Sequence, residues 1–297
     1  MIFINYYDEI KNELVNNEIT KKVKDYSKNR SDLITYYNVG KLLFEAGKHY
    51  GEGIIKEYSK RLTNEFETKF GITLLKRIRQ FYIVIEKGAT MSHQLSWSHY
   101  CELLPVNSID KINYYIKITK EQNLSIRELR AKIKNNEYER LDESTKEKLK
   151  EKEKLKLPDL VKNPIQIKNT SGNNEISEKV LQKLILEDIP SFLKELGNGF
   201  SFIDNEYKIK MGDRYNYIDL LLYNIKYKCY VVVELKVTEL NSNHTGQIQK
   251  YMNYIDKNIK SIDDNKTVGI IICKKENNYV IEYCSDDRII AREYELV

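Results

Sequence analysis

Apolar side chains recur at three- and four-residue steps through the first half of the chain, as in Val39, Leu42, Leu43 and Ala46. This spacing puts apolar groups on one face of an α-helix, so residues 8–140 are predicted to be helical. Glycines, which favour turns and helix ends, divide the region into several helices. They are Gly51, Gly53, Gly71 and Gly88.

The spacing changes after residue 175. Residues 175–196 keep an amphipathic helical pattern, with a break at Pro190. Strand-like runs then follow, interrupted by one more helical stretch. The runs are residues 201–210, 217–223, 229–237, 267–274 and 279–284, and the helical stretch is 246–257. This order predicts an α/β domain with a mixed central sheet.

The segment between these two regions is polar. Residues 142–156 are a run of Lys and Glu, which is typical either of a solvated helix with i,i+4 ion pairs or of a helical spacer. Residues 158–174 contain two prolines and the string NTSGNN, a composition typical of linkers. The predicted organisation is therefore a domain at 1–157, a linker at 158–174 and a second domain at 175–297.

The composition fits a soluble protein with two domains. The chain has 297 residues, 41% of them hydrophobic and 31% charged, which excludes a disordered or collagen-like class. No apolar run is long enough to cross a bilayer, and the acidic start lacks a signal-peptide pattern. We therefore expect a cytoplasmic protein without a membrane partner. The four cysteines and four histidines are dispersed, so a disulfide framework or a zinc site is not expected.

Positive charge is concentrated in the first half. Residues 1–157 contain 30 Lys and Arg against 23 Asp and Glu, a net charge of +7, whereas residues 158–297 contain 19 against 21, a net charge of −2. A basic half suits a polyanion such as nucleic acid, because neutralised phosphates release counterions. The alternative is an ordinary solvated Lys/Glu surface.

A candidate helix-turn-helix lies in the basic half. Residues 54–67, a turn at Gly71 and residues 73–86 have the required pattern. The second helix carries Lys76, Arg77 and Arg79, which are candidate DNA-binding residues; a solvated basic face is the alternative. We expect Trp97, His93 and His99 to pack and cap locally.

The strand at 229–237 places charge inside an apolar run. Alternation along a strand points Glu234 and Lys236 to one face, and Val233, Leu235 and Val237 to the other. Buried charges are costly unless they are paired or bind a metal. The alternative is a strand end that emerges into solvent with a surface Glu–Lys pair.

The preceding strand supplies a second carboxylate. If a hairpin turns between Lys226 and Tyr227, Asp219 lies opposite Glu234 on the same face. Two facing carboxylates repel, so one must take up a proton or both must share a divalent cation such as Mg²⁺. An Asp followed by Glu-x-Lys on the adjacent strand favours metal-dependent phosphodiester hydrolysis, with Lys236 stabilising charge or positioning water.

Further residues could join this site. Glu175 and Glu178 lie at the start of the 175–196 helix, where the helix dipole alone also favours acids. Gln247 and Tyr251 are one helical turn apart and share a face, so they either line the site or simply pack.

At these residues the chain resembles the PD-(D/E)XK nuclease superfamily, with Ile218-Asp219 in place of Pro-Asp. More narrowly, FLKELGNGFSF, GDRYNYIDLLLYN, YVVVELKV, GQIQKYMNYID and VGIIICK occur in the order found in the YhcG-like family. The resemblance implies that Asp219 and Glu234 are metal ligands and that Lys236 is catalytic. It also implies that Glu178 is the acid of the first helix and that Gln247 approaches the site.

The first half also resembles that family, in YYNVGKLL, LLKRIRQFY and LSWSHYCELL. The resemblance implies a helical domain with winged-helix or helix-turn-helix character. The expected protein is thus an α+β chain with an N-terminal all-α domain that binds DNA and a C-terminal α/β restriction-endonuclease-like domain. The expected activity is endonucleolytic hydrolysis of DNA with Mg²⁺ or Mn²⁺. A homodimer is compatible with this class.

Two alternatives come from other functional classes. One is a catalytically silent module that binds DNA or assembles with proteins while keeping the nuclease fold. The other is a transcription regulator, which would depend on the N-terminal half alone. The complete Asp219, Glu234 and Lys236 set favours the enzyme over both.

Overall fold

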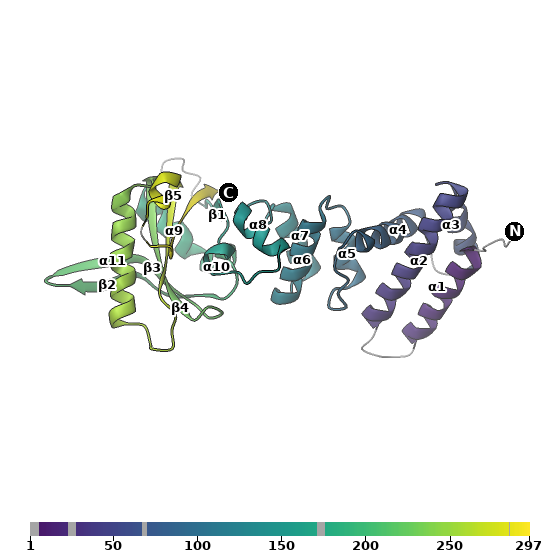
Figure 1. Cartoon of the computed structure of the whole chain (residues 1–297), viewed down its shortest axis with the longest axis horizontal. Helices are drawn as coiled ribbons and strands as arrows, with labels where there is room; N and C mark the ends of the chain where they lie inside the picture. Colours follow the sequence, from purple (N-terminus) through teal and green to yellow (C-terminus); the bar gives the residue numbers. More distant parts are fainter. Residues whose placement is uncertain (1–5, 23–27, 67–69, 171–175, 285) are drawn as a thin grey trace. The chain divides into compact units, whose positions relative to one another are not determined.

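The structure is a computed structural model of the chain, and it describes residues 6–22, 28–66, 70–170, 176–284 and 286–297. The chain forms two compact units, Met1–Tyr138 and Glu139–Val297 (Figure 1). No helix in the described ranges is long and apolar enough to cross a membrane.

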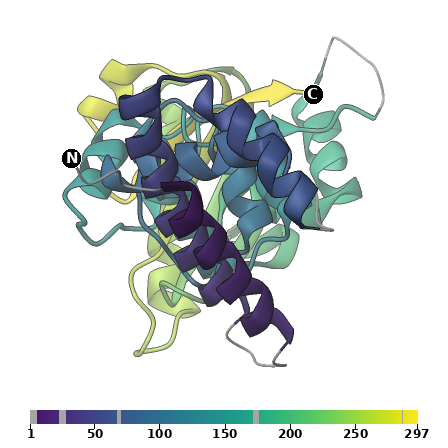
Figure 2. The ribbon, with the colours of Figure 1, turned by 90° about the vertical axis from the view of Figure 1, so that its right-hand side faces the viewer.

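The first unit is helical, as predicted. Its helices are α1 (Tyr6–Lys22), α2 (Lys28–Tyr50), α3 (Ile54–Glu65), α4 (Ile72–Glu86), α5 (Trp97–Leu103), α6 (Ile109–Gln122) and α7 (Ile126–Lys134). The helices α1 and α2 lie side by side (Figure 2). Gly40 of α2 allows α4 to approach closely, because a Cβ atom there would come within 2.5 Å of the Ile78 carbonyl oxygen.

The predicted pair of helices around Gly71 is present as α3 and α4. The Ser59 hydroxyl donates to the Phe70 carbonyl at 2.7 Å and ties the end of the connection to α3. DNA binding by this pair stays a prediction. The expected local role of His99 is confirmed: it forms a capping box with Ser96 at the start of α5, and Trp97 packs against Phe81.

The second unit contains the predicted mixed sheet. Its strands are β1 (Ile165–Ile167), β2 (Phe200–Met211), β3 (Arg214–Asn224), β4 (Cys229–Glu239), β5 (Val268–Lys275) and β6 (Ile289–Leu296). The strand order is β1-β6-β5-β4-β3-β2. The pairs β2–β3 and β3–β4 are antiparallel, whereas β4–β5, β5–β6 and β1–β6 are parallel.

The predicted register of the hairpin formed by β3 and β4 is confirmed. The Cα partners run from Asn224↔Cys229 to Leu220↔Val233, which is the register of a turn centred between Lys226 and Tyr227. This series of partners ends one residue before Asp219 and Glu234. The two acids therefore occupy the place where the ladder between the strands ends.

Helices cover both faces of the sheet. The predicted helix at 175–196 is divided into α9 (Glu178–Glu187) and α10 (Ile189–Leu196), with Asp188 capping the second. They pack on the face that carries Val231, Val233 and Leu235.

The opposite face carries Val232 and packs against α11 (Ser242–Asn258). Gly269 of β5 allows this helix to lie close to the sheet, since a Cβ there would meet Met252 Sδ at 2.6 Å.

The last part of the chain differs from the expectation. Residues 279–284 were predicted to be a strand, but most of them form α12 (Asn278–Glu282). Tyr279 and Tyr283 are 75% and 80% exposed, so the β-favouring side chains find no sheet face to pack on. Strand propensity depends on such packing. The last strand of the chain is instead β6, in which Arg292, Glu293 and Glu295 interrupt the apolar pattern that is typical of a buried strand.

The chain divides earlier than the expected linker at 158–174. That segment contains a 3-10 turn, Pro158–Leu160, and β1, which pairs with β6 at the edge of the sheet. The Lys/Glu run forms α8 (Glu143–Lys150), which belongs to the second unit. The prolines and polar residues give this segment the composition of a linker, although it contains a turn and a short strand that pairs with β6.

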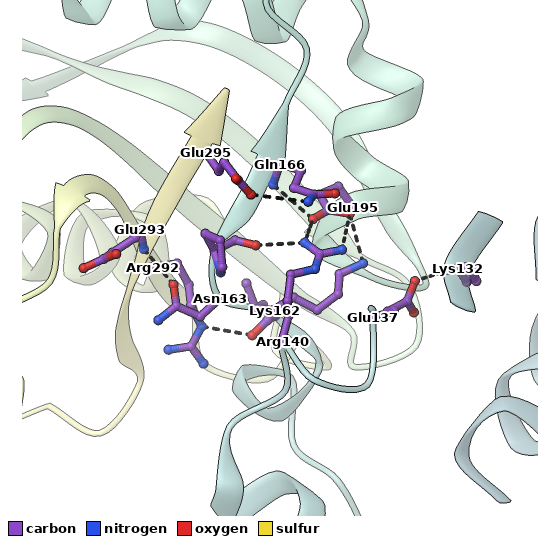
Figure 3. Close-up of polar contacts among 12 residues, drawn as sticks. Lys132, Glu137, Arg140, Lys162, Asn163, Gln166, Glu195, Arg292, Glu293 and Glu295 are labelled. Carbon is purple, nitrogen blue, oxygen red and sulfur yellow. Dashed lines mark hydrogen bonds and ion pairs between the residues drawn. The ribbon is translucent and has the colours of Figure 1, made fainter. Parts of the chain in front are cut away.

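Buried ion pairs attach this segment to the sheet unit. The guanidinium of Arg140 donates to Glu195 and to the Pro164 carbonyl, and Lys162 Nζ lies 3.2 Å from the other Glu195 oxygen (Figure 3). The guanidinium of Arg292 donates to the Val161 carbonyl at 2.9 Å. Residues 139–167 are therefore part of the second unit and not a free spacer.

Candidate active site

Five of the predicted site residues lie on four elements of the second unit. Asp219 is on β3, Glu234 and Lys236 are on β4, Glu178 begins α9 and Gln247 is in the second turn of α11. Side-chain contacts join four of them into one cluster: Glu178, Lys236, Glu234 and Gln247. Asp219 joins the cluster through the β4 backbone.

Asp219 is held by the neighbouring strand and helix. Its carboxylate accepts a hydrogen bond from the Leu235 backbone N–H at 2.8 Å. Its own backbone carbonyl accepts one from Gln182 of α9 at 3.0 Å. Burial raises the pKa of the Asp219 carboxyl group, although the Leu235 bond opposes the shift. The carboxylate is thus fixed in position where β3 and β4 separate.

Glu234 is the most deeply buried acid of the site, with only 1% of the residue exposed. Burial, followed by the negative charge of Asp219, raises the pKa of Glu234 to about 8. Within the described residues its Oε1 atom is buried and has no hydrogen-bond partner. A buried oxygen without a partner lowers stability, so it is rare in native proteins and is often explained by a bound ion or a catalytic role.

Lys236 links the two sides of the site. Its Nζ lies 3.5 Å from Glu234 Oε2 and 3.6 Å from Glu178 Oε2. Burial opposes the ammonium charge, but the carboxylates of Glu234, Asp219 and Glu178 outweigh it and raise the pKa of Lys236. The lysine is therefore a charged donor at neutral pH, surrounded by acids.

Gln247 and Tyr251 provide the contact from α11. Gln247 Nε2 donates to Glu234 Oε2 and to the Tyr251 hydroxyl, each at 3.1 Å. Lys236 and Gln247 both contact Glu234 Oε2, whereas the buried Oε1 atom is available for another ligand. The helical spacing left open whether Gln247 and Tyr251 line the site or only pack. In the structure Gln247 contacts Glu234, and Tyr251 contacts Gln247.

The start of α9 holds the remaining acid. Glu178 is the first residue of that helix, and its side chain is 46% exposed. The Ser177 hydroxyl caps the helix by accepting from the Val180 N–H. Glu175, the other candidate acid, lies outside the described residues. Gln182 was missed by sequence reasoning, because a side chain that binds a backbone carbonyl leaves no signal in the pattern.

The donor set fits a hard divalent cation in part. No group of three or more His, Cys, Asp or Glu side chains in the described ranges is close enough to hold a metal ion. Two carboxylates, Asp219 and Glu234, are nevertheless brought together, and one buried oxygen of Glu234 has no partner. Mg²⁺ is often held by one or two carboxylates, with water and substrate phosphate completing its shell.

The predicted DNA-binding residues lie in the first unit, on α4. Lys76 and Arg77 are exposed. Arg79 is only 19% exposed and donates to Glu52 at 2.7 Å. Lys76 and Arg77 therefore present their charge to solvent, whereas that of Arg79 is already paired.

Comparison with known proteins identifies both units. Residues 158–297 match the family described as the YhcG PDDEXK nuclease domain, and residues 9–140 match the DUF1016 N-terminal domain. An Escherichia coli (strain K12) protein described as "Putative nuclease YhcG" is 25% identical over 309 residues. The match covers 88% of this chain and 82% of that relative.

Two solved structures match part of this chain. A repair endonuclease from Pyrococcus abyssi and an EndoMS–dsDNA complex are 18% and 17% identical, and each match covers 43% of this chain. The matches span about half of those chains, 49% and 48%, with a TM-score of 0.30 in each case.

The helical unit matches one of these families and the mixed-sheet unit matches the other. Residues 9–140 accordingly form a DUF1016 N-terminal domain and residues 158–297 a YhcG PDDEXK nuclease domain, the two parts of a YhcG-like protein.

Proposed function

We propose that this protein is a metal-dependent endonuclease that hydrolyses phosphodiester bonds in DNA. The observation that carries the proposal is the grouping of Asp219, Glu234 and Lys236 where β3 and β4 separate, with Glu234 Oε1 buried and unpartnered. Membership in a nuclease family supports the same conclusion. Mg²⁺ or Mn²⁺ is the proposed cofactor.

Each side chain has a distinct part in this proposal. Asp219 and Glu234 would hold the cation, and the Leu235 N–H and Gln247 orient their carboxylates. A bound divalent cation would polarise the scissile phosphate and lower the pKa of an attacking water. Lys236 is a charged donor beside the two acids, so it can hold that water or neutralise charge on the phosphate. Glu178 keeps Lys236 in place from the start of α9.

A cleavage assay with the full chain tests the proposal. Linear, nicked, branched and single-stranded DNA are incubated with the purified protein in Mg²⁺, Mn²⁺ or EDTA. Cleavage in either metal and none in EDTA is expected. Binding of DNA without cleavage of any substrate would instead support the catalytically silent module.

Lys236→Ala should reduce cleavage strongly but leave metal binding nearly unchanged. The reason is that an ammonium group is no ligand for Mg²⁺, whereas loss of one charged donor at a transition state costs about 10²–10³-fold in rate. Calorimetric titration with Mn²⁺ and cleavage rates would be compared for the wild type, Lys236→Ala and Glu234→Ala. If Lys236→Ala lost as much metal affinity as Glu234→Ala, the lysine would be a structural support.

We also propose that the N-terminal unit supplies much of the affinity for DNA, because residues 1–138 contain 23 Lys and Arg against 17 Asp and Glu, a net charge of +6. Lys76→Gln/Arg77→Gln should weaken duplex binding and flatten its salt dependence by about two units, at about 0.9 per phosphate contact. Arg79→Gln should change the slope less, since Glu52 already pairs with that residue.

The matched control for this measurement is Lys120→Gln/Lys134→Gln, which removes two exposed charges from the same unit. Binding to unrelated duplex sequences is measured at several salt concentrations. If Lys76→Gln/Arg77→Gln had the same affinity and salt slope as this control, the basic residues of α4 would be a solvated face that does not contact DNA. The N-terminal unit would then be better explained as a protein-interaction module.

A further inference from the structure

The hairpin formed by β2 and β3 is longer than the sheet needs. Its outer part, residues 207–217, extends past α11 and away from the other strands (Figure 1). The register remains regular there, with Lys208↔Tyr217 and Lys210↔Tyr215 as Cα partners. The strands turn through Gly212, whose φ of +59° favours glycine. We call residues 207–217 the arm.

One face of the arm is basic and aromatic. Lys208 Nζ lies over the Tyr215 ring, 3.9 Å from its centroid, and Lys210 Nζ lies at 5.8 Å. Tyr215 and Tyr217 are 55% and 52% exposed, which is unusual for large aromatic side chains. These four side chains form two cross-strand pairs that face solvent.

The other face of the arm packs inward. Tyr207, Ile209 and Met211 join the apolar cluster that includes Ile218 and Met252. This contact fixes which side of the hairpin is presented to solvent. The arm is therefore anchored along one face, and its exposed face is held in a defined orientation.

The charge of the arm is opposite to that of its domain. It contains Lys208, Lys210 and Arg214 against the single acid Asp213, a net charge of +2. Residues 158–297 as a whole have a net charge of −2. Lys208 and Lys210 lie on the face of the exposed tyrosines, whereas Arg214 is the partner of Met211 at the exposed tip of the hairpin. Exposed cations beside exposed tyrosines are typical of a surface that contacts nucleic acid.

The arm continues along β3 into the candidate active site. Tyr215 and Tyr217 precede Asp219 by four and two residues on this strand. At about 3.4 Å per residue, Tyr217 and Tyr215 are about 7 and 14 Å along the strand from Asp219. A polyanion bound by the arm would thus have phosphates near the catalytic carboxylates.

We infer that the arm binds duplex DNA and guides it to the site formed by Asp219, Glu234 and Lys236. This inference rests on the proposed function. A two-stranded β-ribbon fits the major groove of B-form DNA, which is about 12 Å wide. Lys208 and Lys210 then meet phosphates beside the two tyrosines, which contact sugars or base edges, and Arg214 meets a phosphate from the tip of the hairpin. The nuclease unit contributes its own DNA contact in addition to that proposed for α4.

Binding by the full chain in EDTA tests the arm without requiring cleavage. Lys208→Gln/Lys210→Gln/Arg214→Gln should lower affinity for a labelled duplex at least about tenfold near 0.15 M salt and flatten the salt slope by up to about 2.7 units. Tyr215→Thr/Tyr217→Thr should lower affinity with the slope unchanged, because tyrosine neutralises no phosphate. Thr is chosen because it favours strands.

The matched control is Lys194→Gln/Lys257→Gln/Lys266→Gln, which removes three exposed charges from the same unit but away from the arm. It should bind duplex DNA like the wild type. Trypsin provides a second measurement on the unaltered chain: bound duplex should protect the bonds after Lys208, Lys210 and Arg214. Arm variants with the affinity of the control, or no protection from trypsin, would overturn the inference.

Two further probes decide the occupant. An RNA duplex of the same sequence should depend less on the arm, because the A-form major groove is too deep and narrow for a ribbon. Loss of affinity for single-stranded DNA alone would overturn the choice of a duplex. If the wild type binds duplex through the arm but cleaves nothing in Mg²⁺ or Mn²⁺, the proposed function fails while the arm's role stands.

Discussion

Replacing Asp219 or Glu234 with alanine is expected to abolish DNA cleavage by this protein. Each substitution removes one of the two carboxylates proposed to hold the divalent cation, so the loss should be at least about 10²–10³-fold in rate. The fold should survive, because the Glu234 carboxylate is buried against a second acid and its charged form is unfavourable there. Cleavage rates and circular dichroism spectra check both expectations.

Glu239→Ala is the matched control for this measurement. It removes another carboxylate from the same strand, but the Glu239 side chain is 52% exposed and its partners, Lys275 at 3.9 Å and Asn277 at 3.1 Å, are outside the site. This control should cleave at the rate of the wild type. Wild-type cleavage by Asp219→Ala or Glu234→Ala would show that the site is misplaced, whatever nuclease activity the chain has.

The second large effect is on stability. Without metal, Glu234→Gln should stabilise the protein at alkaline pH. The folded state raises the pKa of Glu234 from 4.5 to about 8. The contribution of its neutral form to stability is therefore complete below pH 4.5 and is lost as the pH rises to about 8. At about 1.4 kcal/mol per pKa unit, the loss is of the order of 3–5 kcal/mol, and glutamine avoids it.

Urea unfolding in EDTA from acidic to alkaline pH measures this difference. The free energies of unfolding of the wild type and Glu234→Gln should agree at low pH and separate as the pH rises towards 8. Glu239→Gln should follow the wild type throughout, because its carboxylate is exposed. Parallel curves for the wild type and Glu234→Gln would mean that Glu234 ionises in the folded protein at its ordinary pKa.

Several features of the site follow from local patterns in the sequence. Alternation along 229–237 predicted that Glu234 and Lys236 share a face, and Val231, Val233 and Leu235 indeed pack on the opposite one. The turn between Lys226 and Tyr227 predicted the register of β3 and β4. Both predictions succeed because the two strands are adjacent in sequence, and a short turn determines which residues face each other.

The organisation of the chain was predictable in part. The helical first half, the mixed sheet and the break between α9 and α10 were visible in the spacing of apolar residues. The strands β1 and β6 were not, since each depends on a partner far away in sequence. For the same reason residues 158–174 resembled a linker, although Ile165–Ile167 completes the sheet.

The tertiary structure alone decided how the acids of the site are used. Nothing in the sequence shows that Gln247 takes up one oxygen of Glu234 and that the other is left buried without a partner. Nothing in it shows that Leu235 rather than a side chain orients Asp219. These contacts join elements separated in the chain, and burial sets the pKa of Glu234 through everything packed around it. By itself, the sequence indicated which residues form the candidate site; the packing of α9 and α11 on the sheet determined their environment.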